Sequence, residues 1–257
     1  MRLAMLLALL AAASPAFAGP PECVARSGHA TAMLVELYTS EGCDSCPPAD
    51  AWLARIAGDA AFAKGVVPIA FHVDYWDYIG WKDPFASPAY TARQREIAAR
   101  GGARFAYTPQ VVVAGRDYRA WSDAPRFASA VRASNAKPAR ASIAITHGIA
   151  EGEGVSLKLE AVVSDVAARA GAVAYLGVYE DGLSSRITAG ENRGATLGHD
   201  RVIRAWLGPF GLDAAGRVEV ERRVALPRGA SASGVVAVVE NRLTGDVLQA
   251  LAAPACR

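Results

Sequence analysis

Two cysteines separated by two residues stand directly after an apolar segment of this chain. Residues 32–39 contain Val, Leu and Tyr in the pattern of a buried β-strand. A short polar turn leads to Cys43 and Cys46, and Pro47 and Pro48 follow, where a helix would take its first turn. Prolines are tolerated there because the first N–H groups of a helix have no intrahelical partner. The sequence therefore predicts a strand that leads into a Cys-x-x-Cys pair at a helix N-terminus.

This position favours redox chemistry at the cysteine pair. The free N–H groups and the dipole of a helix N-terminus stabilise a thiolate, and two intervening residues leave the sulfurs close enough to bridge. We expect Cys43 to be the nucleophile and the more exposed sulfur, and Cys46 the more buried resolving thiol. The Asp44 carboxylate opposes ionisation of Cys43, and Pro47 removes one N–H group. The pair is therefore expected to have an intermediate or reducing potential.

The first 18 residues have the pattern of a secretory signal peptide. Arg2 supplies a positive charge, residues 3–13 are apolar, and residues 16–18 (Ala-Phe-Ala) form a small-x-small cleavage site. We expect cleavage after Ala18 and a periplasmic or secreted protein; an uncleaved anchor is the alternative. No later segment has about 18 uninterrupted apolar residues, so stable membrane insertion is not expected.

The chain contains four cysteines, and disulfides persist in an exported protein. If Cys43 pairs with Cys46, then Cys23 and Cys256 remain, one near each end of the mature chain. Chain termini often lie close together, so a structural disulfide between these two is the pairing that we expect among three possible ones. Its long loop would stabilise the fold by at most about 4–5 kcal/mol in the chain-entropy model.

The charge of the mature chain is nearly balanced. Residues 1–18 contain one Arg and no acidic residue, so their removal leaves 26 Lys and Arg against 25 Asp and Glu. This balance gives no support for nucleic acid or an acidic membrane as a partner. The remaining 239 residues are enough for one large domain or two small ones.

Strand and helix patterns alternate in the first half of the chain. The β-α-β spacing implies a right-handed crossover, which places the first two strands in one parallel sheet. A Thr-Pro pair then enters a third strand, where a proline is permitted, and Asp123 is expected to cap the last helix. The expected elements are a helix over 49–63, a buried strand over 66–73, a helix over 91–100, a strand and hairpin after residue 109, and a helix over 123–132.

The pattern changes after a polar segment at residues 134–140, which is expected to be a domain boundary. Short alternating strands separated by Gly-bearing turns follow, and they predict a small β-sandwich. Strands are expected over 155–161, 172–179, 201–206, 218–226 and 235–239. The expected organisation is a signal peptide (1–18), an α/β domain (19–134) that begins with a tether over 19–30, and a β-rich domain (141–257).

An aromatic and acidic loop, residues 74–85, follows the second strand at the edge where open α/β sheets bind ligands. Trp76 and Trp81 are candidates for a substrate groove beside the cysteines; a core belonging to the loop itself is the alternative. Asp74 and Asp77 are expected to be turn-forming carboxylates or, alternatively, proton acceptors for the buried thiol.

Two polar clusters in the second half, residues 191–194 and 199–201, are unusual for a β-sandwich. They include Asn192 and His199. Either they fold back over the redox edge as a second part of the site, or they only form hydrogen bonds within their own loops.

Three features resemble the thioredoxin-like superfamily. They are the strand–Cys43-x-x-Cys46–Pro47–helix arrangement, the strand that follows it, and Thr108-Pro109 before a later strand. In that superfamily the equivalent proline is cis and lies beside the disulfide, where the neighbouring backbone contacts the substrate. The resemblance therefore implies a cis Thr108–Pro109 bond and a substrate-binding role for both residues.

Four segments resemble, more narrowly, a family of exported and uncharacterised thioredoxin-like proteins, the DUF1223 family. They are VELYTSEGCDSCPPAD, HVDYWDYIGWKDPF, YTPQ and ENRGATLGHDRVIR. The resemblance covers nearly the whole mature chain. It implies an α/β thioredoxin-like domain with an appended β-rich, sandwich-like domain, and it brings no established activity.

Two classes of function remain open. In the leading hypothesis, Cys43 and Cys46 exchange disulfides with protein substrates and with a redox partner protein, without a cofactor. The alternative is a non-enzymatic module, in which the disulfide is structural or Cys43, Cys46 and His72 bind Cu(I). His147 and His199 are further candidates for the third ligand. A zinc site would usually need a second ligand pair at short spacing, which the sequence lacks. His72 is equally compatible with a hydrogen-bonded core position.

Overall fold

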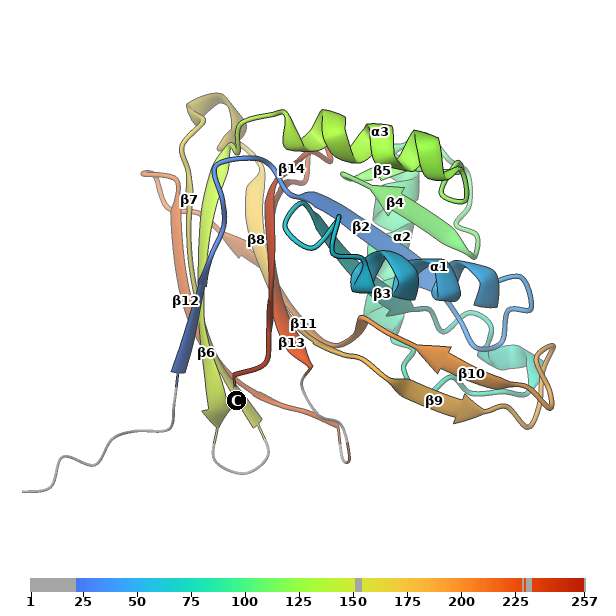
Figure 1. Cartoon of the computed structure of the whole chain (residues 1–257). Helices are drawn as coiled ribbons and strands as arrows, with labels where there is room; N and C mark the ends of the chain where they lie inside the picture. Colours follow the sequence, from blue (N-terminus) through green and yellow to red (C-terminus); the bar gives the residue numbers. More distant parts are fainter. Residues whose placement is uncertain (1–21, 151–153, 228, 230–232, 257) are drawn as a thin grey trace, which may run out of the picture.

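The computed structural model describes residues 22–150, 154–227, 229 and 233–256 (Figure 1). The expected signal peptide at residues 1–18 lies outside this part of the chain. Across the described ranges, no helix has the length and apolar character needed to cross a membrane. The fold is mixed α/β, with two large sheets, one hairpin and three α-helices in the described residues.

An eight-stranded mixed sheet contains the strand that precedes the cysteine pair. Strands β2 (Met33–Thr39) and β3 (Val66–His72) lie parallel near its centre and are buried at every position, as their apolar sequences predicted. Strand β4 (Gln110–Val113) runs antiparallel to β2 on the other side. The order across the sheet is β14 (Val247–Pro254), β13 (Gly234–Asn241), β8 (Ala172–Glu180), β11 (Val202–Gly211), β3 (Val66–His72), β2 (Met33–Thr39), β4 (Gln110–Val113) and β5 (Arg116–Asp117).

Three helices cover both faces of the β3-β2-β4 part of this sheet. Helices α1 (Pro47–Gly58) and α3 (Ala124–Asn135) pack on one face, where Leu53 and Phe127 belong to one core, and α2 (Pro88–Arg100) covers the other (Figure 1). The Asp123 carboxylate accepts a hydrogen bond from the Arg126 N–H at 3.1 Å, so the predicted N-cap is confirmed. Helix α1 ends earlier than expected, and turns occupy residues 60–65.

A second sheet packs against the β14-β13-β8-β11 part of the first. It contains β1 (Glu22–Arg26), β6 (Ala141–Ala150), β7 (Gly154–Val163) and β12 (Arg217–Ala225), all antiparallel. Inward-facing Leu159 of one sheet and Leu176 of the other share one apolar core. The alternation predicted for residues 155–161 therefore places every second side chain in this core.

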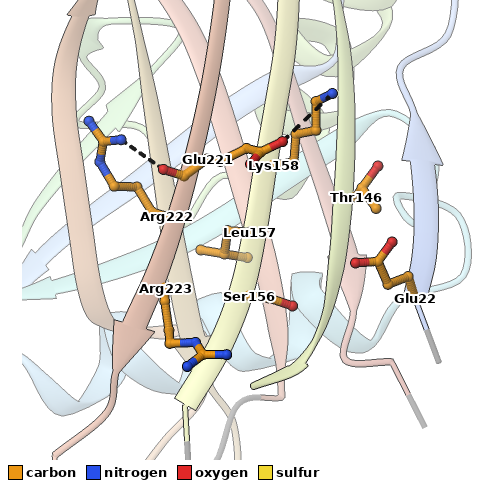
Figure 2. Close-up of a pocket in the computed structure, with 8 residues that line it drawn as sticks. All are labelled: Glu22, Thr146, Ser156, Leu157, Lys158, Glu221, Arg222 and Arg223. Atoms are coloured by element: carbon orange, nitrogen blue, oxygen red, sulfur yellow. Dashed lines mark hydrogen bonds and ion pairs between the residues drawn. The ribbon is translucent and has the colours of Figure 1, made fainter. Parts of the chain in front are cut away.

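The outer face of the four-stranded sheet is polar and open to solvent. The ammonium group of Lys158 lies 2.8 Å from the carboxylate of Glu219 on the neighbouring strand. Figure 2 shows an open hollow on this face, lined by side chains of both charges that include Glu22, Glu221 and Arg223. Because the charges alternate in sign, this face produces no strong field of one sign.

Strand β1 corrects one expectation from the sequence. Residues 19–30 were expected to form a tether, but Glu22–Arg26 pairs with β6, and Cys23 lies opposite His147. Cys23 also forms a disulfide with Cys256, with the two Cα atoms 5.5 Å apart, as the sequence predicted. The Gly- and Pro-rich composition did not indicate this strand, because the strand pairs with residues more than 100 positions away in the sequence. The sequence also failed to predict strands β6 and β14 and the hairpin of β9 (Leu183–Arg186) and β10 (Thr196–His199).

Strands from both sides of the expected domain boundary belong to one sheet. Strand β11 joins β3 in parallel at Val202 and Ala70, and the Ala70 N–H donates to the Arg201 carbonyl at 2.8 Å. The expected boundary itself lies between α3 and β6. Tertiary pairing thus connects the expected α/β and β-rich parts through backbone hydrogen bonds.

Candidate functional site

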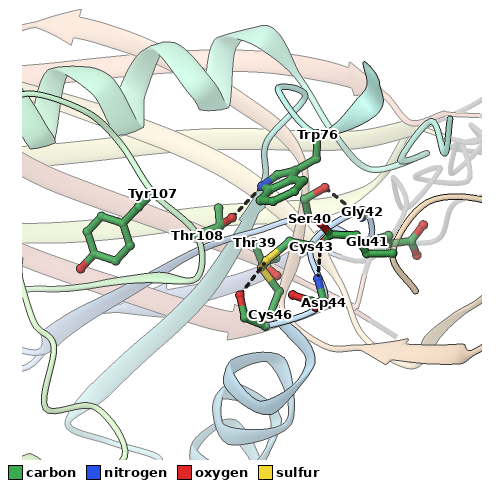
Figure 3. Close-up of a disulfide and its surroundings, with 12 residues drawn as sticks. Thr39, Ser40, Glu41, Gly42, Cys43, Asp44, Cys46, Trp76, Tyr107 and Thr108 are labelled. Atoms are coloured by element: carbon green, nitrogen blue, oxygen red, sulfur yellow. Dashed lines mark hydrogen bonds between the residues drawn. A yellow bond between two sulfur atoms is a disulfide. The ribbon is translucent and has the colours of Figure 1, made fainter. Parts of the chain in front are cut away.

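The Cys43–Cys46 disulfide lies between the end of β2 and the start of α1. Its Cα atoms are 5.5 Å apart, and Cys46 is the N-cap residue of the helix. The N–H groups of Ala49 and Asp50 donate to the Cys46 carbonyl at 2.9 and 3.2 Å. Figure 3 shows the disulfide above the first turn of this helix. The strand, the pair and the helix follow one another as the sequence predicted.

Both cysteines are fully buried, which corrects the expectation that Cys43 would be the more exposed of the two. Each has a relative exposure of 0%. Trp76 lies against the same turn, since a Cβ atom added to Gly42 would lie only 2.9 Å from the Trp76 Cβ. Glycine at position 42 therefore allows the indole-bearing loop to approach the backbone beside Cys43.

A loop from the second half of the chain covers the same edge. It connects β9 (Leu183–Arg186) with β10 (Thr196–His199), and we call residues 187–195 the cover loop. The Asn192 side chain donates to the carbonyl oxygens of Glu41 and Cys43 at 2.8 and 2.9 Å. The Glu191 carboxylate accepts from the Asp44 N–H at 3.1 Å. Of the two arrangements left open by the sequence, the structure has the one in which residues of this region reach the turn that carries the disulfide.

The aromatic loop is attached to the site through both of its candidate tryptophans. The Trp76 indole donates to the Thr108 hydroxyl at 2.7 Å, and Figure 3 places both residues beside the disulfide. The Trp81 indole donates to the Glu41 carboxylate at 2.8 Å. The Thr108–Pro109 bond is cis, as the resemblance implied, and Gly208–Pro209 is cis as well. These contacts fix the loop against the site; a role in substrate binding stays a prediction.

Ser45 is a site residue that the sequence reasoning missed. Its hydroxyl lies 3.4 Å from the Cys43 sulfur, within hydrogen-bonding range for sulfur. In the reduced protein a hydroxyl at this position can donate to the Cys43 thiolate and stabilise it. The available signal was its position between the two cysteines, because a side chain in this short turn lies close to the Cys43 sulfur.

A buried polar cluster lies beside the disulfide turn, and the sequence reasoning identified only its histidines. The His72 Nδ1 lies 2.7 Å from a carboxylate oxygen of Asp83, and the His199 Nε2 lies 3.1 Å from one of Glu41. The Asp50 carboxyl accepts from the Thr39 hydroxyl at 3.0 Å. These five residues of the buried polar cluster have relative exposures of 0–8%: Glu41, Asp50, His72, Asp83 and His199.

Burial and charge shift the pKa values of two carboxyl groups in this cluster in opposite directions. Burial raises the pKa of Asp50 to about 7, although the charge of His199 and the Thr39 hydrogen bond oppose the shift. Burial also acts to raise the pKa of Asp83, but the charge and hydrogen bond of His72 outweigh it and hold that pKa below its usual value. Asp83 is therefore ionised in the folded protein at neutral pH.

The predicted Cu(I) set of Cys43, Cys46 and His72 stays a prediction, and the structure gives His72 other partners. Its ring contacts Asp83 and packs edge-on against His199, with the ring centroids 4.8 Å apart. Both sulfurs of the predicted Cu(I) set are joined in the disulfide. His147 lies in the four-stranded sheet, where burial lowers its pKa. Asp74 accepts from the Thr91 hydroxyl and Asp77 from the Asp83 N–H, which fits the turn-forming role.

Comparisons with known proteins extend over most of the chain. A family model described as a protein of unknown function (DUF1223) matches residues 34–240. No curated protein matches the chain. A solved structure from Agrobacterium tumefaciens, protein AGR_C_4864, is 22% identical with a TM-score of 0.62; the match covers 90% of this chain and 97% of that one. HBP35 of Porphyromonas gingivalis is 13% identical with a TM-score of 0.66, over 89% and 76% of the two chains. These two likenesses concern the fold.

Proposed function

This chain belongs to the DUF1223 family, whose function is unknown, and we propose from its own site that it is a thiol–disulfide oxidoreductase acting through Cys43 and Cys46. The observation that carries the proposal is the position of this disulfide, between a buried parallel strand and the first turn of α1. Helix N-termini lower thiol pKa values and so favour reactive cysteines. The sheet order β3-β2-β4-β5, with helices on both faces, supports a thioredoxin-like arrangement.

The proposed exchange transfers two electrons through a mixed disulfide. In the oxidising direction, a substrate thiolate attacks the Cys43 sulfur, the Cys43–Cys46 bond breaks, and Cys46 leaves as a thiolate. A second substrate thiol, after losing its proton, attacks the substrate sulfur and releases Cys43. The substrate gains a disulfide, and this protein becomes a dithiol. The reducing direction reverses these steps, and a redox partner protein restores the starting state.

Access to the sulfurs requires movement of the covering residues. Trp76 and Asn192 both contact the segment that carries Cys43. In this proposal a protein substrate displaces them and extends its backbone along Thr108 and Pro109. The signal-peptide pattern supports action in the periplasm or outside the cell, where protein disulfides persist.

A second candidate is a non-enzymatic module in which the same disulfide is static. The complete burial of both cysteines favours this candidate, because thiol–disulfide exchange depends on access. A variant of it binds copper(I) through the reduced cysteines.

Reduction of insulin by dithiothreitol, with and without the protein, distinguishes these candidates. We expect catalysed reduction by the unaltered protein, its loss in Cys43→Ser and Cys46→Ser, and a trapped mixed disulfide in Cys46→Ser. The Cys23→Ser/Cys256→Ser double variant is the matched control and keeps the activity if folded. No turnover by the folded protein would contradict the proposal, and Cu(I) binding lost in both single variants would support the copper-handling alternative.

A further inference from the structure

Asp50, His72 and His199 meet from three different elements inside the molecule. They lie in α1, at the end of β3 and at the end of β10, and all three are at least nine-tenths buried. One potential ligand atom from each lies within 4.8 Å of the other two. The His199 Nδ1 lies 4.0 Å from a carboxylate oxygen of Asp50. From this arrangement we propose that these three side chains form a binding site for a divalent transition-metal ion.

The hydrogen bonds on the far side of each imidazole orient the two rings. An ionised carboxylate only accepts hydrogen bonds, so the His72 Nδ1 beside Asp83 and the His199 Nε2 beside Glu41 carry the protons. In the neutral rings, the form in which histidine binds a metal, the opposite nitrogens, His72 Nε2 and His199 Nδ1, present lone pairs. Metal-binding histidines commonly have such a carboxylate on the second nitrogen, which fixes the tautomer and raises ligand basicity. This cluster contains that arrangement twice.

Those two lone pairs have no hydrogen-bond partner within the described residues. A buried polar atom without a partner costs stability, and such atoms are rare in native proteins. Two acceptor nitrogens cannot satisfy each other, and the ionised form of Asp50 would add a third acceptor. A bound cation satisfies all three groups at once. Ligands of zinc lie about 2.0–2.2 Å from the ion, so binding would draw the three side chains closer together.

The donor set determines which class of ion fits. Two imidazole nitrogens and one carboxylate oxygen suit Zn²⁺, Co²⁺ or Fe²⁺, whereas Ca²⁺ and Mg²⁺ prefer oxygen ligands and Cu(I) prefers thiolates. Three protein ligands leave a fourth position for a water molecule. None of the three ligands is a cysteine, so this proposal does not depend on the proposed redox function.

Titration of the tag-free protein, stripped of metal by a chelator, tests the site. We expect one Zn²⁺ or Co²⁺ ion per chain and a rise in Tm on binding. Affinity should fall at least tenfold in Asp50→Asn and in His199→Gln. His147→Gln, the same substitution at a buried histidine of the other sheet, is the matched control and should keep full affinity. The Cys43→Ser/Cys46→Ser double variant should keep it as well.

A measurement on the unaltered sequence avoids dependence on the folding of the variants. The chain has four histidines, so ¹⁵N spectra of the imidazoles can follow each one during a Zn²⁺ titration. We expect shifts at His72 and His199 and none at His29 or His147. Folded protein that binds neither ion, or binding that shifts only His29 or His147, would overturn the proposal. Binding with undiminished affinity in both ligand variants would also overturn it.

Discussion

Single side chains around Cys43 determine how readily this sulfur can act as a thiolate. The Ser45 hydroxyl lies 3.4 Å from the sulfur and can donate to it. Two carboxylates act in the opposite sense, because Asp44 follows Cys43 in the chain and Glu191 binds the Asp44 N–H. Negative charges close to a thiol favour its neutral form. One prediction at the scale of single residues concerns the Ser45 hydroxyl, and a second concerns the two acidic groups.

Replacement of Ser45 by Ala should raise the pKa of Cys43 in the reduced protein by about one unit. The reason is the loss of a hydrogen bond to the charged sulfur, since one pKa unit corresponds to about 1.4 kcal/mol. The pH dependence of iodoacetamide alkylation measures this change. Ser184→Ala, at an exposed serine of β9, is the control. An unchanged alkylation profile in Ser45→Ala would show that the hydroxyl does not stabilise the thiolate.

The reduction potential of the disulfide should be clearly more negative than about −120 mV, the value of a strong oxidant. A strong oxidant needs a highly stabilised thiolate, which Asp44 and Glu191 oppose. Glu191→Gln should therefore shift the potential by roughly 10–30 mV to more positive values. Equilibration with glutathione buffers measures both quantities. A potential near that of a strong oxidant, or a shift to more negative values in Glu191→Gln, would contradict this account.

At the scale of elements, the β9–β10 hairpin extends from the β-rich part to the N-terminus of α1 (Figure 1). Its cover loop forms two hydrogen bonds to the Glu41 and Cys43 carbonyls through Asn192. The disulfide is thus covered by a segment about 150 residues away in sequence. Opening of this segment alone would be a local event, with a lower free-energy cost than global unfolding.

Replacement of Asn192 by Ala should make the Cys43–Cys46 disulfide more accessible to reductant. Loss of two hydrogen bonds, each worth about 1 kcal/mol, should speed reduction by dithiothreitol at least fivefold. Stopped-flow or quenched alkylation measures the rate. Arg193→Ala, at an exposed position of the same loop, is the control and should leave the rate unchanged. Equal rates in both variants and the unaltered protein would mean that the cover loop does not limit access.

At the scale of the whole molecule, a buried ion network and a disulfide connect distant parts of the chain. Arg93 in α2 donates to Glu36 of β2 at 2.8 Å and to Glu240 of β13 at 2.7 Å. Its guanidinium also lies over the rings of Tyr175 and Trp206, at 4.8 and 5.3 Å from their centroids. Burial raises the pKa of Glu36, and the charge of Arg93 opposes that shift. The network therefore joins both parts across the face of the large sheet covered by α2.

Replacement of Arg93 by Ala should lower the free energy of unfolding by roughly 3–5 kcal/mol. The two carboxylates would remain buried without their partner, and removing one partner of a buried ion pair destabilises a protein by about this much. Urea denaturation measures it. Arg126→Ala, which removes the exposed pair with Asp123, is the control, with an expected change below about 1 kcal/mol. A change as small as that in Arg93→Ala would show that the network does not stabilise the fold.

Removal of the Cys23–Cys256 disulfide should lower the free energy of unfolding by about 2–5 kcal/mol. This disulfide joins residues 233 positions apart, whereas Cys43 and Cys46 are 3 apart. In the chain-entropy model the stabilisation grows with loop length. The Cys23→Ser/Cys256→Ser variant should therefore lose more stability in denaturant than Cys43→Ser/Cys46→Ser. The reverse order would contradict the entropic explanation.

Local patterns were sufficient to predict the elements that present the disulfide. Each of these signals depends on only a few neighbouring residues, so the sequence alone indicates it. They are the uninterrupted apolar run of β3, the prolines at the start of α1 and the Asp123 cap. The observed disulfide pairing is the one expected among three possible ones, because the short spacing of Cys43 and Cys46 favoured their pairing and left the terminal cysteines as partners. Strand β1 was not predictable in this way, since its order depends on β6 and on the disulfide to Cys256.

The sequence by itself determined the strand, the Cys-x-x-Cys turn and the helix, because short-range sterics and hydrogen bonding dictate them. Only the tertiary structure decided that Cys43 is buried, in a turn that Trp76 approaches and whose carbonyl accepts from Asn192. The same holds for the meeting of Asp50, His72 and His199. The contacts of Asn192 and His199 bring the second half of the chain to the edge that carries the disulfide, and the pairing of β11 with β3, which no local pattern encodes, joins the same two parts of the chain.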